Sequence, residues 1–259
     1  MSAATGPLPS RESTAWYWNR EAQFMGDNRV RLLTGGDELF PAICEAIDQA
    51  RERVWLATYI FHADEAARRV AEALARAAAR GVAVRVVVDG FGSHASLATL
   101  VPWLRPAGVE LVVFRPLTRW WNWLQPGQLR RLHQKLCVVD GEVGFVGGIN
   151  VIGDRVDLNH GALDAPRLDF AVAVRGPAVQ PIEQTARAVW TRAAVGRDWR
   201  DEMLALARSA QPVASARRLL RALRIARPLP EQAAPLAPVQ VAFLVRDNLR
   251  QRQIGRAHV

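Results

Sequence analysis

Alternating apolar and polar segments divide most of the chain into pieces the size of strands and helices. Short runs rich in Val, Ile and Leu are typical of buried strands, and longer stretches with apolar residues at helical spacing are typical of helices. Between residues 28 and 114 the two kinds alternate, which predicts β–α–β units, a largely parallel sheet and helices on both of its faces. The expected strands are residues 30–33, 54–61, 82–88 and 109–114, and the expected helices are 37–51, 64–80 and a third ending near 105.

Local signals support this α/β reading. Asp64 stands where a side chain can cap the Ala-rich helix, and Gly81 stands where that helix should end. Ligands of parallel sheets bind at the carboxyl ends of the strands. His62, Asp89 and Ser93 follow strands in this way.

The stretch from residue 132 to 150 carries the most informative chemistry. Leu136 to Val139 form an apolar strand, Asp140-Gly141 is a tight hairpin signal, and a second short strand leads to Gly147-Gly148. His133 and Lys135 stand two residues apart, so they should project from the same side of an extended chain. An imidazole can attack phosphorus, and an ammonium together with backbone amides can hold its oxygens. The stretch therefore predicts a site for a phosphate diester.

Composition singles out Lys135. The chain has 34 Lys plus Arg residues, and Lys135 is its single lysine. A chain that otherwise uses arginine keeps a lysine where a compact ammonium is needed instead of a planar fork. The less favoured alternative is that this lysine stands at a solvent-exposed strand end by chance and has no functional role.

Charge and hydropathy limit the partners. The net charge is +9, which favours an anionic partner, either nucleic acid or an anionic membrane surface. Cys44 and Cys137 lie in apolar runs and predict no disulfide. No apolar stretch reaches the length of a membrane span, and residues 1–13 lack a signal-peptide core. No cluster shows metal-ligand spacing, so we expect neither metal nor cofactor.

A tryptophan-rich segment precedes the hairpin. Arg119, Trp120, Trp121 and Trp123 combine guanidinium groups with indoles, a combination suited to lipid headgroups. Membrane contact is the preferred interpretation, ahead of a packed loop with core tryptophans and of stacking on nucleic-acid bases.

The hairpin residues also carry a resemblance. The pattern H-x-K-x4-D-x6-G-G-x-N resembles the signature of the phospholipase D superfamily. The flanking segments 81–93, 145–150 and 169–177 resemble bacterial cardiolipin synthases, in the subgroup without N-terminal transmembrane helices. The resemblance extends from about Asn28 onward. It implies a phospholipase D-like α/β/α sandwich lobe with a mostly parallel central sheet.

The resemblance also implies an activity and residue roles. The expected enzyme moves a phosphatidyl group from phosphatidylglycerol, or a similar phospholipid, to an alcohol-bearing phospholipid through a phosphohistidine. His133 is then the nucleophile or the acid/base, and Asp169 orients it. Lys135, Asn150 and Gly148 bind the phosphate. Asp140 belongs to the catalytic motif, although support of the hairpin is its more natural role. The expected partner is an anionic membrane, at the cytoplasmic side of the inner membrane, and nucleic acid is not expected.

The family pattern contains two such motifs, and this chain contains one. We expect an N-terminal segment at 1–27, a first catalytic lobe at 28–209, a basic and Pro/Ala-rich linker at 210–238, and the start of a truncated second lobe at 239–259. The site would then be completed by the missing lobe or by a second copy. The alternatives are a homodimeric single-motif phosphodiesterase or nuclease, a phospholipase D hydrolase, and an inactive lipid-binding fragment.

Overall fold

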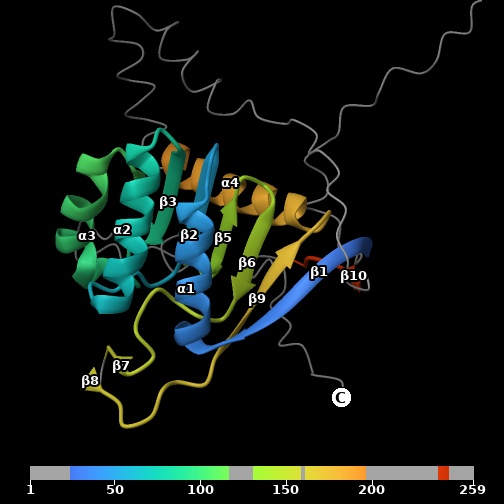
Figure 1. The fold of residues 1–259 in the computed structure, drawn as a ribbon. Coiled ribbons are helices and arrows are strands. Elements are labelled where there is room, and N and C mark those ends of the chain that lie inside the picture. The colour runs from blue at the N-terminus through green and yellow to red at the C-terminus, as the bar shows by residue number, and fades with distance from the viewer. Residues whose placement is uncertain (1–23, 117–130, 159–160, 197–238, 245–259) are drawn as a thin grey trace, which may run out of the picture.

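A computed structural model of the chain describes residues 24–116, 131–158, 161–196 and 239–244. Figure 1 shows a central sheet with helices packed on both faces. The helices are α1 (Gly35–Asp48), α2 (Glu65–Ala79), α3 (Leu97–Leu104) and α4 (Val179–Gly196), with short 3₁₀ turns at His94–Ser96 and Arg105–Ala107. The sheet contains β1 (Met25–Thr34), β2 (Arg53–Thr58), β3 (Ala83–Asp89), β4 (Glu110–Phe114), β5 (Leu136–Val139), β6 (Val143–Gly147), β9 (Phe170–Arg175) and β10 (Val239–Val241). A separate small ribbon is formed by β7 (Val156–Asp157) and β8 (Gly161–Ala162).

Strand direction changes in the middle of the sheet. The order is β10-β1-β9-β6-β5-β2-β3-β4, and β2, β3 and β4 are parallel to one another. The remaining pairs of described strands are antiparallel. The α/β/α sandwich is confirmed, but the expectation of a mostly parallel sheet holds only for β2 to β4. One reason is local: the three residues 140–142 between β5 and β6 are too few for the crossover that parallel strands need.

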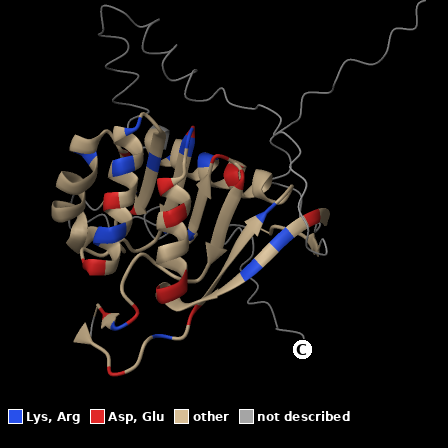
Figure 2. Ribbon diagram, in the orientation of Figure 1, with Lys and Arg blue, Asp and Glu red and all other residues tan. Residues whose placement is uncertain are grey.

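The sheet separates two hydrophobic cores. Side chains alternate across a strand, so Val54 and Leu56 of β2 face α1 and α2, while Trp55 and Ala57 face α4. Strands β5 and β6 lie inside the sheet and carry no charged residue, whereas charges lie along the helices and on other strands such as β1 and β3 (Figure 2). Two-sided burial explains why β2, β3 and β5 read as continuous apolar runs in the sequence.

The predicted cap of α2 is confirmed and has a second use. One carboxylate oxygen of Asp64 accepts the amide of Ala67, 2.9 Å away, and so caps the helix. The other accepts the amide of Gly153 at 2.7 Å. Asp64 therefore ties the start of α2 to the chain that follows Asn150. No helix in the described ranges is long and apolar enough to cross a membrane.

The strand predicted near residue 239 joins the same sheet. β10 pairs antiparallel with β1, Asn28 opposite Val239, and lies at the sheet edge. The assignment of residues 239–259 to a second lobe stays a prediction, as does the linker at 210–238, which lies outside the described residues. The strand β1 begins at Met25, and the boundary at residue 28 between the N-terminal segment and the first lobe stays a prediction.

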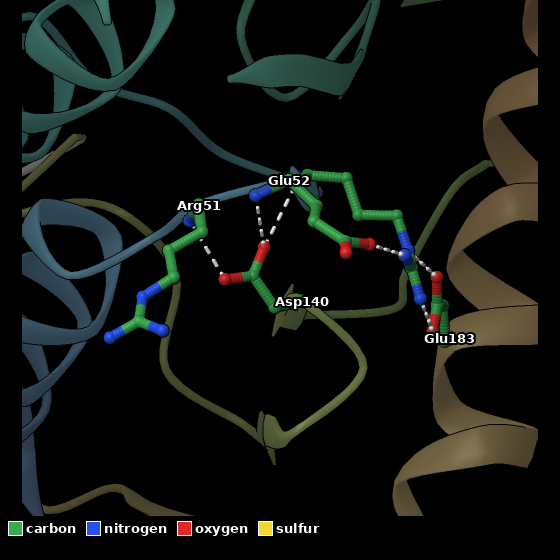
Figure 3. A network of polar contacts seen from close by, with 5 residues as sticks. Arg51, Glu52, Asp140 and Glu183 are labelled. Carbon is green, nitrogen blue, oxygen red and sulfur yellow. Dashed lines mark hydrogen bonds and ion pairs between the residues drawn. The ribbon is translucent and has the colours of Figure 1, made fainter. Parts of the chain in front are cut away.

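Asp140 fixes the hairpin to the rest of the sheet (Figure 3). Its carboxylate accepts the backbone amides of Arg51, Glu52 and Arg53 at 2.8, 2.9 and 2.8 Å. Its φ of 52°, followed by 73° at Gly141, gives the turn the positive dihedrals of a type I′ hairpin. Asp140 lies at the opposite end of β5 from Lys135, roughly 16 Å away along the strand. The placement of Asp140 among the catalytic residues is therefore corrected: its role here is to set where β5 lies against β2.

We expect Asp140→Gly to lower the free energy of unfolding by about 2–4 kcal/mol, because it removes three hydrogen bonds to a charged acceptor. Glycine tolerates the positive φ, so the loss reports on the carboxylate and not on backbone strain. Asp140→Asn, which keeps one acceptor oxygen, should lose less. Urea unfolding measures both, and a loss in Asp140→Gly no larger than in Asp140→Asn would contradict the assignment.

Candidate active site

The reversal of strand direction brings the motif residues to one edge of the sheet. Because β5 runs antiparallel to β2, the chain entering β5 lies beside the chain leaving β2. The end of β6 and the start of β9 reach the same edge, since these strands are also antiparallel. His133, Lys135, Asn150 and Asp169 are thus drawn from three separate strand ends.

His133 and Lys135 are in contact. The Lys135 Nζ lies 3.2 Å from His133 Nδ1 and 3.4 Å from Nε2, and it also lies 3.2 Å from the His133 carbonyl oxygen. Both residues precede the first ladder residue of β5, so they stand at the strand entrance and not within the strand as expected. The prediction that they project together is confirmed by these distances.

Tyr59 completes the wall behind the histidine, and sequence reasoning did not single it out. Its ring centroid lies 5.2 Å from that of His133, and Lys135 Nζ lies 6.0 Å from the Tyr59 ring. Ser93 holds the segment in place: its hydroxyl donates to the Tyr59 carbonyl at 3.1 Å and accepts the Phe61 amide at 2.9 Å. The available signal was its position directly after an apolar strand, where ligands of such sheets bind.

Asp89 anchors the chain that leads to His133. This carboxylate is fully buried at the end of β3 and accepts the Leu132 amide at 2.8 Å. It also accepts the amides of Phe91 and Gly92 at 2.8 and 3.1 Å. Burial raises the pKa of Asp89, while these hydrogen bonds act in the opposite direction. One buried acid thus connects β3, the loop after it and the residue next to His133.

The electrostatics favour a neutral imidazole. Partial burial lowers the pKa of His133, the charge of Lys135 lowers it further, and the charge of Asp89 opposes both. Burial also lowers the pKa of Lys135, against the opposing charge of Asp169. A neutral imidazole keeps the lone pair that a nucleophile or general base requires.

The Gly-Gly pair is required by close packing. A Cβ on Gly147 would lie 2.5 Å from the Phe170 carbonyl oxygen, and one on Gly148 would collide with the Asp169 carboxylate. The Gly148 amide donates to the Phe170 carbonyl at 2.9 Å. The expectation that Gly148 binds phosphate is therefore corrected: its N–H is already used to join β6 to β9.

Asn150 and Asp169 face a polar pocket. The Asn150 side-chain oxygen accepts the Ile60 amide at 3.1 Å, and the residue lines the pocket. The Asp169 carboxylate accepts the amide of Phe170 at 2.8 Å, and no hydrogen bond joins it to His133. Its charge acts on Lys135 instead. The orienting role implied for Asp169 thus stays a prediction for a state in which the two side chains meet.

The pocket has a volume of about 280 Å³. Asp154 lies on its wall, almost fully buried, with its carboxylate 2.5 Å from the Gly36 amide at the start of α1. The Arg167 guanidinium is held by the Gly153 carbonyl at 3.1 Å. The pocket is lined by Ile149, Asn150, Asp154, Arg167, Leu168 and Asp169.

Two further expectations concern membrane and metal. Arg119, Trp120, Trp121 and Trp123 lie outside the described residues. Within the described ranges, no group of three or more His, Cys, Asp and Glu side chains is close enough to hold a metal ion.

Part of the chain is similar in sequence to known proteins. Residues 43–163 match the family model described as cardiolipin synthase, PLD-like domain. Cardiolipin synthase B of Salmonella typhi is 38% identical over 157 residues, which cover 61% of this chain and 37% of that protein. Cardiolipin synthase A of Pseudomonas fluorescens is 39% identical over 170 residues, or 66% and 35% of the two chains. Cardiolipin synthase B of Escherichia coli K12 is 34% identical over 157 residues, or 61% and 37%.

This chain therefore spans little more than a third of the length of these curated relatives. Among solved structures, a phospholipase D family member, Nuc from Salmonella typhimurium, is 20% identical with a TM-score of 0.47, covering 63% of this chain and 94% of that one. That likeness is too weak to bear on function.

Replacing Lys135 by methionine should raise the pKa of His133, because the substitution removes a positive charge that now lowers it. The part of the shift caused by burial should remain. Lys135→Arg, which keeps the charge, should leave the pKa low. Titration of the histidine ring protons by NMR measures all three proteins, and an unchanged or lower pKa in Lys135→Met would contradict the assigned contact.

Proposed function

This chain carries a phospholipase D-like domain of the cardiolipin synthase family, and on that premise we propose that it supplies one half of a phosphatidyl transfer site. The donor is phosphatidylglycerol or a similar phospholipid, and the acceptor is the hydroxyl of a second phospholipid headgroup. The reaction takes place at an anionic membrane surface, at the cytoplasmic side of the inner membrane. The basic charge of the chain suits such a surface.

One observation carries the proposal: a lone lysine lies 3.2 Å from a histidine whose pKa is lowered. Such a histidine is neutral near pH 7, and an adjacent ammonium can attract a phosphate oxygen while the imidazole attacks phosphorus. In this proposal the amide group of Asn150, whose side-chain oxygen accepts the Ile60 amide, holds a second oxygen.

The reaction has two balanced steps. A His133 ring nitrogen forms a bond to phosphorus, and the bond from phosphorus to the headgroup oxygen breaks, with a proton supplied to the leaving glycerol. The acceptor hydroxyl then loses a proton and attacks the phosphohistidine, which releases His133 and yields cardiolipin. A second imidazole is needed as acid and then base. It comes from the second motif of a complete two-lobed protein or from a second copy of this chain.

The polar pocket beside Asn150 suits the acceptor headgroup. Carboxylate oxygens of Asp154 and Asp169 can accept from a polyol, and the Arg167 guanidinium can hold its phosphate. Asn150 and Asp169 line the pocket, and the charge of Asp169 acts on Lys135, so a hydroxyl bound there would lie on the same side of the site as the phosphate. A headgroup seated there displaces water, and that displacement favours transfer over hydrolysis.

The test is to trap the intermediate. The chain is mixed with isotopically labelled phosphatidylglycerol in vesicles, quenched under alkaline conditions and digested with trypsin. The peptide of residues 132–135 contains His133 as its single histidine, and it should carry the phosphatidyl group by mass spectrometry. His133→Ala should abolish the adduct, and Lys135→Met should slow its formation by roughly 10²–10³-fold, the usual effect of losing one anion-binding contact.

The products separate the alternatives. Cardiolipin supports transfer, phosphatidic acid as the sole product indicates a hydrolase, and cleavage of an oligonucleotide with no lipid product indicates a nuclease. Turnover without any adduct on His133 would reassign this histidine as the acid/base. Vesicle binding without turnover, unchanged in His133→Ala, would indicate a lipid-binding fragment.

Arg167→Gln should raise the KM for the acceptor phospholipid about tenfold, the effect of one charge-assisted contact, while the rate of adduct formation stays the same. Arg155→Gln is the matched control, because Arg155 lies in the same loop but donates to the Asp164 carbonyl and does not line the pocket. Single-turnover and steady-state kinetics give the two quantities. If both substitutions changed the KM equally, the acceptor would not bind in this pocket.

A further inference from the structure

Three arginines meet on the sheet face covered by α1, at the end of β9 remote from the active site. Arg29 and Arg31 stand two residues apart on β1, so both project toward the same face. Arg175 lies directly opposite Arg29 on β9. Figure 2 shows the basic positions of β1 and β9 close together near this edge of the sheet. Like charges directly opposite each other across two strands repel and destabilise the pair.

These arginines line a pocket of about 240 Å³. A water molecule occupies about 30 Å³ of liquid, so the pocket can hold a much larger group. The floor is apolar, with Val143, Phe145 and Ala173 on the strands and Ala42 and Ala46 on α1. Its acidic member is Glu45, whose carboxylate lies 3.4 Å from the Gln49 amide and forms no ion pair with the arginines.

The guanidinium groups have no acidic partner in the described part of the chain. Neither an ion pair nor a side-chain hydrogen bond joins Arg29, Arg31 or Arg175 to a described residue. Two nitrogens of Arg29, Nε and Nη2, are moreover buried from solvent without a hydrogen-bond acceptor. A buried charged donor without an acceptor is costly, so such a group calls for a partner from outside the described residues.

Arg85, in the same sheet, is a buried arginine whose charge does have partners. It too has two buried nitrogens without a hydrogen bond, but a third forms an ion pair with Glu110 at 3.1 Å. Its guanidinium also lies 4.9 and 5.5 Å from the ring centroids of Trp55 and Trp190. Arg29 has neither kind of contact.

We propose that the pocket formed by Arg29, Arg31 and Arg175 binds a phosphate-bearing anion. A planar guanidinium group can donate two parallel hydrogen bonds to two oxygens of one phosphate. Three such groups around one pocket therefore favour an anion with several phosphate oxygens. Arg175 is separated from the active-site end of β9 by roughly 17 Å of strand. The site is therefore distinct from the His133 site and can be tested independently of the proposed transfer reaction.

The experiment uses the full chain with Lys135→Met, so that the active site contributes less to anion binding. Isothermal titration with inorganic pyrophosphate measures a soluble ligand, and co-sedimentation with vesicles of phosphatidylglycerol or phosphatidylcholine measures a lipid headgroup. Arg29→Gln combined with Arg175→Gln should weaken binding at least tenfold in one or both assays. The control is Arg51→Gln combined with Arg105→Gln, which removes the same charge elsewhere and should leave affinity within twofold.

The two assays identify the source of the phosphate. Loss of pyrophosphate affinity with unchanged vesicle binding assigns a soluble anion, whereas loss of binding to phosphatidylglycerol vesicles assigns a lipid headgroup. If the double variant is poorly folded by circular dichroism, the exposed Arg31→Gln alone provides the measurement. Equal losses in the pocket and control variants, or no binding in either assay, would overturn the proposal.

Discussion

The grip of Asp140 on the amides of Arg51 to Arg53 is the constraint from which the rest of the site follows. A three-residue connection makes the hairpin antiparallel, and the Asp140 carboxylate then fixes the hairpin against the start of β2. The register pairs Ala57 with Leu136, so the residues just before β5 must lie beside those just after β2. A slip of one residue would turn His133 and Lys135 toward the opposite face. Asp140 therefore influences the position of His133 and Lys135 from the far end of β5, through the geometry of the sheet.

Asp89 and the glycine pair refine what the hairpin positions. The buried Asp89 carboxylate holds the chain at Leu132, next to His133. Gly147 and Gly148 allow β9 to approach closely enough for Asp169 to act on Lys135. Asp89, in the parallel half of the sheet, thus holds the chain next to His133. Asp169, in the antiparallel half, acts on Lys135 through its charge. An opposite charge on each side of two basic groups limits how far their pKa values fall.

The sequence allowed the elements and the contact between His133 and Lys135 to be predicted, because both depend on local patterns. Apolar runs located β2 to β6, the cap at Asp64 located α2, and the spacing of two residues placed His133 beside Lys135. Strand direction was harder, since residues 54–61 and 136–139 read alike as buried runs whether their neighbours are parallel or antiparallel. The role of Gly148 was misjudged because hydrogen-bond use depends on the distant Phe170. Tyr59 was missed for a similar reason. Its ring packs beside that of His133, which lies 74 positions later in the chain, and patterns of residue spacing do not predict contacts at that separation.

The hairpin also has a consequence for the order of folding. Residues 132 to 150 form a contiguous unit whose turn closes a short loop, so its strands can pair early at little entropic cost. The contacts that place it are remote: the bond from Arg53 to Asp140 spans 87 residues, and the bond from Leu132 to Asp89 spans 43. We therefore expect the histidine and lysine to become neighbours before the contacts around them form. The Tyr59 wall and the altered acidity of the pair should emerge only in the last, cooperative stage, when the hairpin docks onto β2.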